Sequence, residues 1–246
     1  MEPSEYDNIA RLEDRHWWYR GMAAISLNFL TSVPPSRKQL RILDAGCGPG
    51  GMLRHLAAVG LPFGIDLHSL ALAYAHRTTS ASLARATVER LPFADHSFDL
   101  VTSFDVLYHL AVGDDVAALT EFARVLKPDG LLLIRLPAFE QLRGAHDRTV
   151  HTRHRYTAPE LRSKLDAAGF RVRRLTYANT LLFPLIALSR LMQGRANEHT
   201  DVELPSPALN HLLEFVLGLE RRWLTHFNLP FGVSLFALAQ PTDDAS

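Results

Sequence analysis

Short apolar runs alternate with stretches of helical periodicity along residues 40–138, and this alternation restricts the fold more than any other feature of the chain. Nearly continuous apolar runs occupy residues 41–46, 62–67, 98–107 and 131–138. Such runs are typical of strands that are covered on both faces. Helical spacing is found between them, at residues 51–60, 69–78 and 116–126. The alternation predicts a parallel α/β sheet with helices on both faces.

Other parts of the chain extend this pattern. Residues 86–91 are expected to hold a short third strand. Gly60 is expected to end the helix that precedes the second strand. Two further strands are predicted at residues 171–178 and 233–240. The fifty or so residues between them are mostly helical and apolar, and they are too many for a hairpin loop.

Composition excludes several classes of protein. Lys plus Arg and Asp plus Glu are equal at 26 each, so no overall charge attracts nucleic acid. A single cysteine, Cys47, rules out an internal disulfide and fits a reducing compartment. The charged first twenty residues lack the apolar centre of a signal peptide, and the longest apolar run is shorter than the roughly 20 residues that span a bilayer. We therefore expect a soluble cytoplasmic protein without stable membrane insertion.

A glycine turn follows the first predicted strand, in the sequence GCGPGG that begins at Gly46 and includes Gly48 and Gly50. Glycine permits positive φ there and lets a ligand approach the main chain. Glycine turns also join strand to helix for purely structural reasons. However, Asp66 ends the second strand about 20 residues later, where a carboxylate can accept both ribose hydroxyls. Together the two features predict a nucleoside-containing ligand.

Asp44 narrows the choice of ligand. It lies two residues before the turn, where it would repel the pyrophosphate of a dinucleotide. A carboxylate at this place suits an ammonium or sulfonium group better. S-adenosylmethionine (SAM) is therefore favoured over NAD.

Four motifs resemble those of one family, in order and at normal spacing. They are ILDAGCGPGG, GIDLHS, LPFADHSFDLVTSFDVLYHL and LTEFARVLKPDGLLLI. They resemble the class I SAM-dependent methyltransferases, and most closely the small enzymes called methyltransferase type 11. The resemblance covers about residues 40–180. It implies a Rossmann-like seven-stranded mixed sheet of order 3-2-1-4-5-7-6, with the last strand antiparallel.

The resemblance also implies cofactor-binding roles. The glycine turn would face the methionine part of SAM, with Asp44 near its amino group. Asp66 would bind the ribose, and Leu67 would lie against the adenine. Ser103 and Phe104 would complete the wall beside the sulfonium.

One position departs from the family pattern. The acid that normally meets the adenine amino group is replaced by Thr87, followed by Val88, whose amide would bind a ring nitrogen. A hydroxyl makes a weaker contact than a charged group. Glu89 would take the acid's place if the loop were shifted.

Three segments are candidates for the methyl acceptor site. Tyr108 and His109 follow the fourth strand, at the edge of the sheet where ligands bind in open α/β folds. The aromatic run Trp17, Trp18 and Tyr19 suits a lid or an aromatic contact to the acceptor. His109 is a candidate catalytic residue and Tyr108 a candidate acceptor contact, with packing under the cofactor as the alternative for His109. Packing of the first helices against the sheet explains the aromatic run equally well.

The third candidate is the basic segment of residues 143–156, which follows the fifth strand. Its candidate catalytic and acceptor-binding residues are His146, Asp147, His151, Arg155 and Tyr156. A histidine oriented by Asp147 would be the base, and an arginine would hold an anionic group. The spacing fits no standard metal site, so no metal is expected. The alternative is a solvated loop that docks the next helix.

We divide the chain into one domain, residues 1–246, with four parts. These are an N-terminal helical lid (1–36), a SAM-binding core (37–178), a helical cap (179–232) and a last strand with tail (233–246). The apolar cap would pack on the core, contact a hydrophobic acceptor or form a homodimer.

The predicted function is methyl transfer from SAM to a small molecule that carries an apolar or anionic group. Oxygen or carbon is favoured over nitrogen as the acceptor atom, because histidines are available as bases. The alternatives are a non-catalytic SAM-binding regulatory protein and, with less support, an NAD-dependent dehydrogenase.

Overall fold

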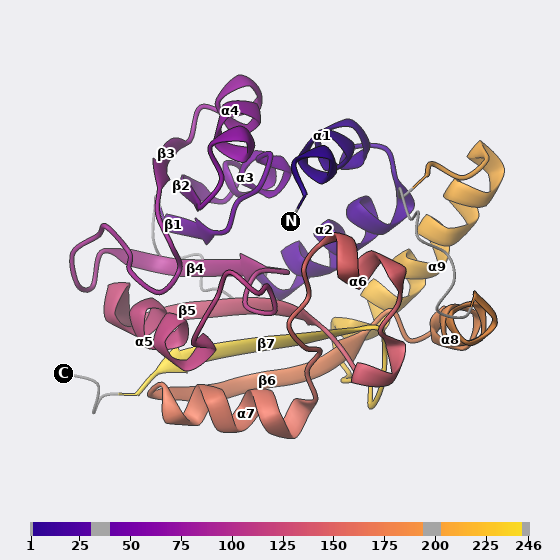
Figure 1. Ribbon diagram of the computed structural model, residues 1–246. Helices are drawn as coiled ribbons and strands as arrows, with labels where there is room; N and C mark the ends of the chain where they lie inside the picture. Colours follow the sequence, from indigo (N-terminus) through magenta and orange to yellow (C-terminus); the bar gives the residue numbers. More distant parts are fainter. Residues whose placement is uncertain (1, 31–39, 194–202, 243–246) are drawn as a thin grey trace.

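The computed structural model describes residues 2–30, 40–193 and 203–242. Seven strands form one sheet of order β3-β2-β1-β4-β5-β7-β6 (Figure 1). The strands are β1 (Leu40–Ala45), β2 (Gly60–Asp66), β3 (Ser82–Arg85), β4 (Phe98–Phe104), β5 (Leu126–Pro137), β6 (Phe170–Ala178) and β7 (Ser234–Pro241). β7 pairs antiparallel with both β5 and β6, and the other pairs are parallel. The predicted α/β sheet and its strand order are confirmed.

Helices cover both faces of the sheet. They are α1 (Pro3–Leu12), α2 (Trp17–Leu30), α3 (Gly51–Leu56), α4 (Ser69–Thr78), α5 (Asp115–Val125), α6 (Ala145–Thr149), α7 (Ala158–Ala167), α8 (Phe183–Gln193) and α9 (Pro207–Leu224), with a short 3-10 helix at Glu140–Leu142. α5 and α7 bury their apolar sides in one core cluster. α2 and α9 contribute to the cluster on the other face, where Phe29 stacks on Phe236 of β7. The sheet is therefore buried on both sides, which explains its continuous apolar strands.

Two local predictions were wrong. The third strand is Ser82–Arg85 and ends just before the predicted segment, whose residues 86–89 lie outside the sheet and line a cavity. Gly60 does not cap α3, which ends at Leu56; it begins β2 instead. A Cβ on Gly60 would lie 2.2 Å from the Leu40 carbonyl oxygen, so close approach of β1 explains the glycine.

The cap helices α8 and α9 lie on the right in Figure 1, whereas α1 lies above the sheet near its centre, and α2 lies between α1 and α9. Trp17 N donates to Asn210 Oδ1 of α9, and Asn210 Nδ2 donates to the Arg15 carbonyl oxygen. Arg20 of α2 forms an ion pair with Glu214 of α9. The lid and the cap therefore contact each other directly. Residues 31–39, which include the predicted boundary between the lid and the SAM-binding core, lie outside the described residues.

Candidate active site

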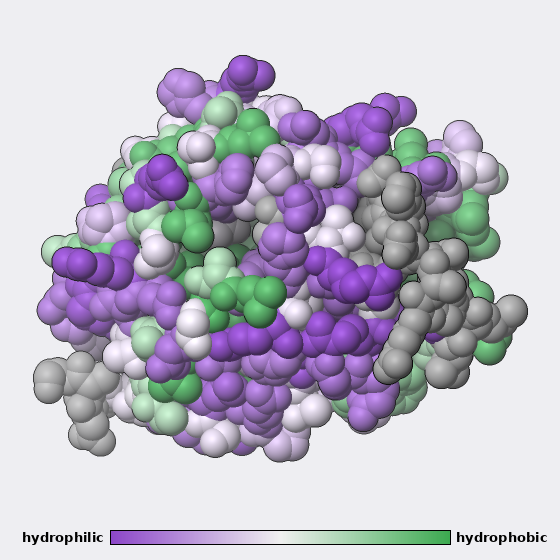
Figure 2. All heavy atoms as spheres, in the orientation of Figure 1, coloured by the Kyte–Doolittle hydropathy of each residue, from purple (hydrophilic) through white to green (hydrophobic). Residues whose placement is uncertain are grey.

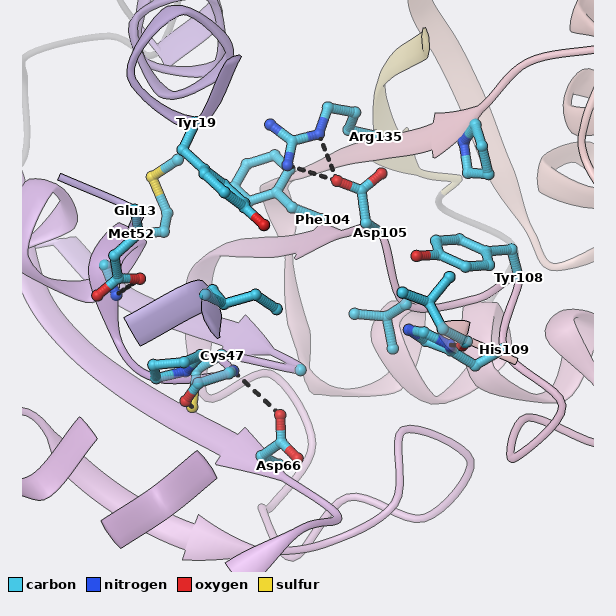
Figure 3. Close-up of a pocket in the computed structure, with 18 of the residues that line it drawn as sticks. Glu13, Tyr19, Cys47, Met52, Asp66, Phe104, Asp105, Tyr108, His109 and Arg135 are labelled. Carbon is cyan, nitrogen blue, oxygen red and sulfur yellow. Dashed lines mark hydrogen bonds and ion pairs between the residues drawn. The ribbon is translucent and has the colours of Figure 1, made fainter. Parts of the chain in front are cut away.

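A cavity of about 570 Å³ lies at the carboxyl ends of the parallel strands. Its walls come from the glycine turn, the ends of β2, β4 and β5, the lid helices, the segment after β5, and α8. Figure 3 shows part of this wall, with Glu13 and Asp66 on one side and Tyr108 and His109 on the other. The cavity is large enough for a nucleoside ligand together with a small acceptor.

Gly46, Gly48 and Gly50 of the turn all have positive φ, but each is required for a different reason. A Cβ on Gly46 would lie 2.3 Å from the Val106 side chain, so this glycine makes room for the loop after β4. A Cβ on Gly48 would meet nothing within 4 Å, because Gly48 faces the cavity. Gly50 does not line the cavity; its Cβ would press on Ala75 of α4. Gly48 is thus the position at which a ligand can touch the bare main chain.

Asp66 fixes the shape of the turn. Its Oδ2 accepts a hydrogen bond from Gly48 N at 3.0 Å (Figure 3). Its Oδ1 accepts one from His68 N at 2.8 Å. Burial raises its pKa, while the two backbone donors act in the opposite direction. An ionised carboxylate has about four acceptor positions, so Asp66 retains capacity for ribose hydroxyls.

Asp44 is almost fully buried at the base of the cavity. Thr102 Oγ1 donates a hydrogen bond of 2.8 Å to Asp44 Oδ1. Burial raises the pKa of Asp44 to about 7, although Thr102 and Arg135 lower it. A positively charged ligand beside this carboxyl would favour its ionised form. This property fits the ammonium and sulfonium groups of SAM and does not fit a phosphate.

The expected adenine wall is present as a group. Leu67, Thr87, Val88 and Glu89 all line the cavity. Glu89 Oε1 already accepts a hydrogen bond from Asp114 N at 2.8 Å, so this carboxylate also holds the start of α5.

The two residues at the end of β4 have different surroundings. Ser103 is fully buried outside the cavity, and its Oγ donates to the Ala45 carbonyl oxygen at 2.9 Å. Phe104 lines the cavity and lies 5.2 Å beneath the Arg135 guanidinium. Arg135 donates to Asp105 Oδ2 through Nε at 2.9 Å and through Nη2 at 2.5 Å (Figure 3).

The lid is closed over the glycine turn. Trp17, Trp18 and Tyr19 line the cavity. Glu13 accepts hydrogen bonds from Gly51 N and Arg54 Nη1, both at 3.1 Å. The lid therefore binds the first turn of α3 directly, beside the predicted methionine site.

Tyr108 and His109 both line the cavity. His109 Nδ1 lies 2.6 Å from the Val150 carbonyl oxygen, so Nδ1 carries the proton in this contact. Burial lowers the pKa of His109 to about 4. His109 is therefore neutral near pH 7, with its lone pair on Nε2.

Within the basic segment, Asp147 contacts arginines. Its Oδ1 accepts from Arg155 Nη1 at 2.8 Å, and its Oδ2 accepts from Gly144 N at 2.7 Å and Arg190 Nη1 at 3.4 Å. Burial alone would raise the pKa of Asp147, but Arg155 brings it below its usual range. Both oxygens are directed at these donors, so the geometry does not support a histidine oriented by Asp147.

The other candidates in this segment differ in position. His151 lines the cavity and its Nε2 lies 2.9 Å from Glu2 Oε1 of the lid. Tyr156 is fully buried away from the cavity, and its hydroxyl donates to Asp115 Oδ2 at 2.7 Å. Tyr156 therefore connects α5 to the segment and does not reach the site. The side chain of His146 lies outside the described part of the chain.

Four charged residues that line the cavity were not predicted in the site: Glu13, Asp105, Arg135 and Arg190. Arg135 is the only charged residue in the apolar run of β5, and that exception was the available signal. Arg190 belongs to the cap, and nothing in the sequence places it near residue 147. Within residues 2–30, 40–193 and 203–242, no group of three His, Cys, Asp or Glu side chains is arranged to hold a metal ion.

Comparison with known proteins agrees with this geometry. Residues 43–134 match the family model described as a methyltransferase domain. The malonyl-[acyl-carrier protein] O-methyltransferase of Enterobacter lignolyticus is 33% identical over 188 residues, which cover 71% of each chain. A probable SAM-dependent methyltransferase of Mycobacterium tuberculosis is 30% identical over 167 residues, covering 66% of this chain but only 58% of that protein.

Solved structures show the same fold. A putative methyltransferase of Haloferax volcanii, in complex with the Trm112 activator, superposes with a TM-score of 0.62 at 22% identity, covering 98% of this chain and 94% of the other. A SAM-dependent methyltransferase from Mesorhizobium loti gives a TM-score of 0.59 at 19% identity, covering 93% and 99%. The likenesses support methyl transfer over both alternatives, the NAD-dependent dehydrogenase and the non-catalytic SAM-binding protein.

Proposed function

The chain belongs to the class I SAM-dependent methyltransferases, and from that premise we propose that it transfers the methyl group to an oxygen of a small acceptor that carries an anionic group. SAM supplies a methyl group bound to a positively charged sulfur. SAM would be held by the glycine turn, by Asp44 and Asp66, and by Leu67, Thr87, Val88 and Glu89. The support for this assignment is that Gly46, Gly48 and all six of these other residues line the cavity.

The distribution of charge in the cavity carries the proposal. Acidic side chains line the end formed by the lid and the glycine turn, with Glu13, Asp44 and Asp66. Arginines 135, 155 and 190 line the part formed by β5, the basic segment and α8. β2, which ends in Asp66, and β5, which carries Arg135, are separated by two strands, so their backbones lie roughly 14 Å apart.

The arginine end has an excess of positive charge. Arg135 is matched by Asp105, and Asp147 is shared between Arg155 and Arg190. Two carboxylates therefore face three guanidinium groups. Asp147 and Arg155 are nearly fully buried, where a remaining charge acts more strongly than it would in water. A carboxylate or phosphate on the acceptor would balance the excess positive charge of the three arginines.

The available bases also favour an acceptor that is already ionised. A displacement at the methyl carbon needs alignment and exclusion of water, and it needs a base only if the acceptor holds a proton. With a pKa of about 4, His109 is a weak base. It is better suited to orient the acceptor through Nε2, while Trp17 and Trp18 exclude water. The similar protein from Enterobacter lignolyticus is named as an O-methyltransferase.

Transfer from radiolabelled SAM to matched acids and amides would test this proposal. Malonate half-thioesters, aromatic carboxylic acids and their amides would be offered as acceptors, together with primary amines. We expect labelled esters from some acids and no product from the paired amides. Equal transfer to acids and amides, or transfer to amines alone, would contradict the proposal.

A further inference from the structure

The cap helix α9 exposes a stripe of large apolar side chains. Leu212 is 57% exposed, Phe215 62%, Leu219 42% and Trp223 55%. Their spacing of three, four and four residues places them on one side of the helix. The opposite side is buried against the core, where Leu217 is fully enclosed. In Figure 2, hydrophobic atoms appear at the right-hand end, where Figure 1 places α8 and α9.

A second cavity borders this stripe. It has a volume of about 380 Å³ and lies between α2 and α9. Its small residues are Gly21, Ala24 and Gly218, and a Cβ on Gly218 would meet nothing within 4 Å. Phe215 belongs both to this cavity and to the stripe. The groove and the stripe therefore form one continuous surface.

The charges of the groove are mainly basic. Arg20, His211 and Arg221 line it, and the one acid, Glu214, is paired with Arg20 at 2.9 Å. Arg222 is exposed on the next position of the helix. A bulky apolar face beside arginines is the pattern of helices that lie in a membrane interface. The groove is suited to a phosphate head group, and the stripe is suited to acyl chains.

We propose that α9 and the α2–α9 groove dock on an anionic phospholipid surface. The lipid phosphate would bind between Arg20, His211 and Arg221, and Phe215 and Trp223 would enter the acyl region. Binding would be peripheral, since none of the described helices is long and apolar enough to cross a membrane. Two copies that paired through this face would bring their arginines together, which disfavours a dimer contact. The proposal does not depend on the identity of the methyl acceptor.

Sedimentation with phospholipid vesicles tests the proposal directly. The full chain should bind vesicles of phosphatidylglycerol and phosphatidylcholine in a 1:1 mixture, and bind pure phosphatidylcholine at least about tenfold more weakly. Arg221→Glu with Arg222→Glu should reduce binding to the anionic vesicles by more than about tenfold. The matched control is Arg162→Glu on the exposed side of α7, which should bind as the parent does.

The apolar stripe is tested separately. Phe215→Ser with Trp223→Ser should reduce vesicle binding about tenfold or more, whereas Leu61→Ser, at a residue 44% exposed on β2, should not. Circular dichroism and SAM affinity would verify that the variants fold. Failure of the parent protein to bind anionic vesicles would overturn the proposal. So would a vesicle-free dimer, detected by light scattering, that the stripe variants convert to monomer.

Discussion

The two ends of the active-site cavity are built in different ways. At the glycine turn, the ligand surface is main chain, held by Asp66 through hydrogen bonds to the backbone of residues 48 and 68. At the arginine end, the surface consists of long side chains from β5, the basic segment and α8. Arg155 and Arg190 meet at Asp147, and Arg135 pairs with Asp105. A turn whose main chain is held by hydrogen bonds suits a constant cofactor. Side chains from separate segments can be substituted one at a time without altering the others, which suits an acceptor that varies among related enzymes.

The largest effect is expected from Asp66→Ala. The variant loses the ribose acceptor and both hydrogen bonds that shape the turn, so the Kd for SAM should rise at least about 100-fold. Isothermal titration calorimetry of the variant and of the parent protein measures the Kd for SAM. Asp95→Ala, at an exposed carboxylate paired with Arg124, is the control and should bind SAM normally. An unchanged Kd for Asp66→Ala would mean that another residue binds the ribose hydroxyls.

At the other end of the cavity, Arg190→Gln should affect the acceptor and leave the cofactor unchanged. Removal of one of the three guanidinium groups should raise KM for an acidic acceptor about 10- to 100-fold, with the Kd for SAM changed less than about twofold. Arg162→Gln on α7 is the matched surface control. An equal loss of affinity for SAM would show that the two ends do not act separately.

A pair of glycine variants separates ligand contact from packing within the turn. Gly48→Ala points a methyl group into the cavity, so it should weaken SAM binding about tenfold while costing roughly 1 kcal/mol of stability. Gly50→Ala, at φ 100° and against Ala75, should lower the melting temperature more and SAM affinity less. Calorimetric binding and thermal unfolding of both variants measure the two effects. The reverse ranking would mean that Gly50 faces the ligand.

The smallest effect is expected from Glu13→Gln, which weakens the contact between the lid and α3. The dissociation rate of SAM should increase about three- to tenfold. Stopped-flow measurement of the fluorescence of Trp17 and Trp18 can follow the dissociation of SAM. Asp14→Asn, at a more exposed partner of Arg54, should change the rate less. If SAM dissociated at the same rate from both variants, the contact of the lid through Glu13 would not contribute to retention of the cofactor.

The difference between the two ends also explains what could be predicted from the sequence. Asp44, the glycine turn and Asp66 lie within 23 consecutive positions, and strand–turn–helix geometry fixes their relation. Strand order followed from the family resemblance. The apolar periodicity predicted the other strands, but it placed the third strand at residues 86–91, of which 86–89 line the cavity instead.

The arginine end could not be predicted in the same way. Arg135, Arg155 and Arg190 are separated by 20 and 35 residues along segments of different structure, and only the folded cap brings Arg190 to Asp147. Ser103 was predicted in the site from the family resemblance, and Tyr156 because it belongs to the basic segment that follows the fifth strand. The structure places both in the core, where their hydroxyls satisfy buried partners. Proximity in sequence to a strand end does not decide which way a side chain points.

The central claim is that the buried carboxylate Asp44, at the glycine turn, binds beside a positively charged nucleoside. Titration of SAM into the protein at several pH values tests this claim most directly. With a pKa of about 7 for Asp44 in the free protein, binding must displace a proton below that pH. Affinity should therefore fall by up to about tenfold per unit below pH 7 and level off above it. Proton release should appear as a dependence of the binding heat on buffer. Asp44→Asn should bind weakly and without this pH dependence. If affinity for SAM were the same at pH 6 and pH 8 in the parent protein, the claim would be contradicted.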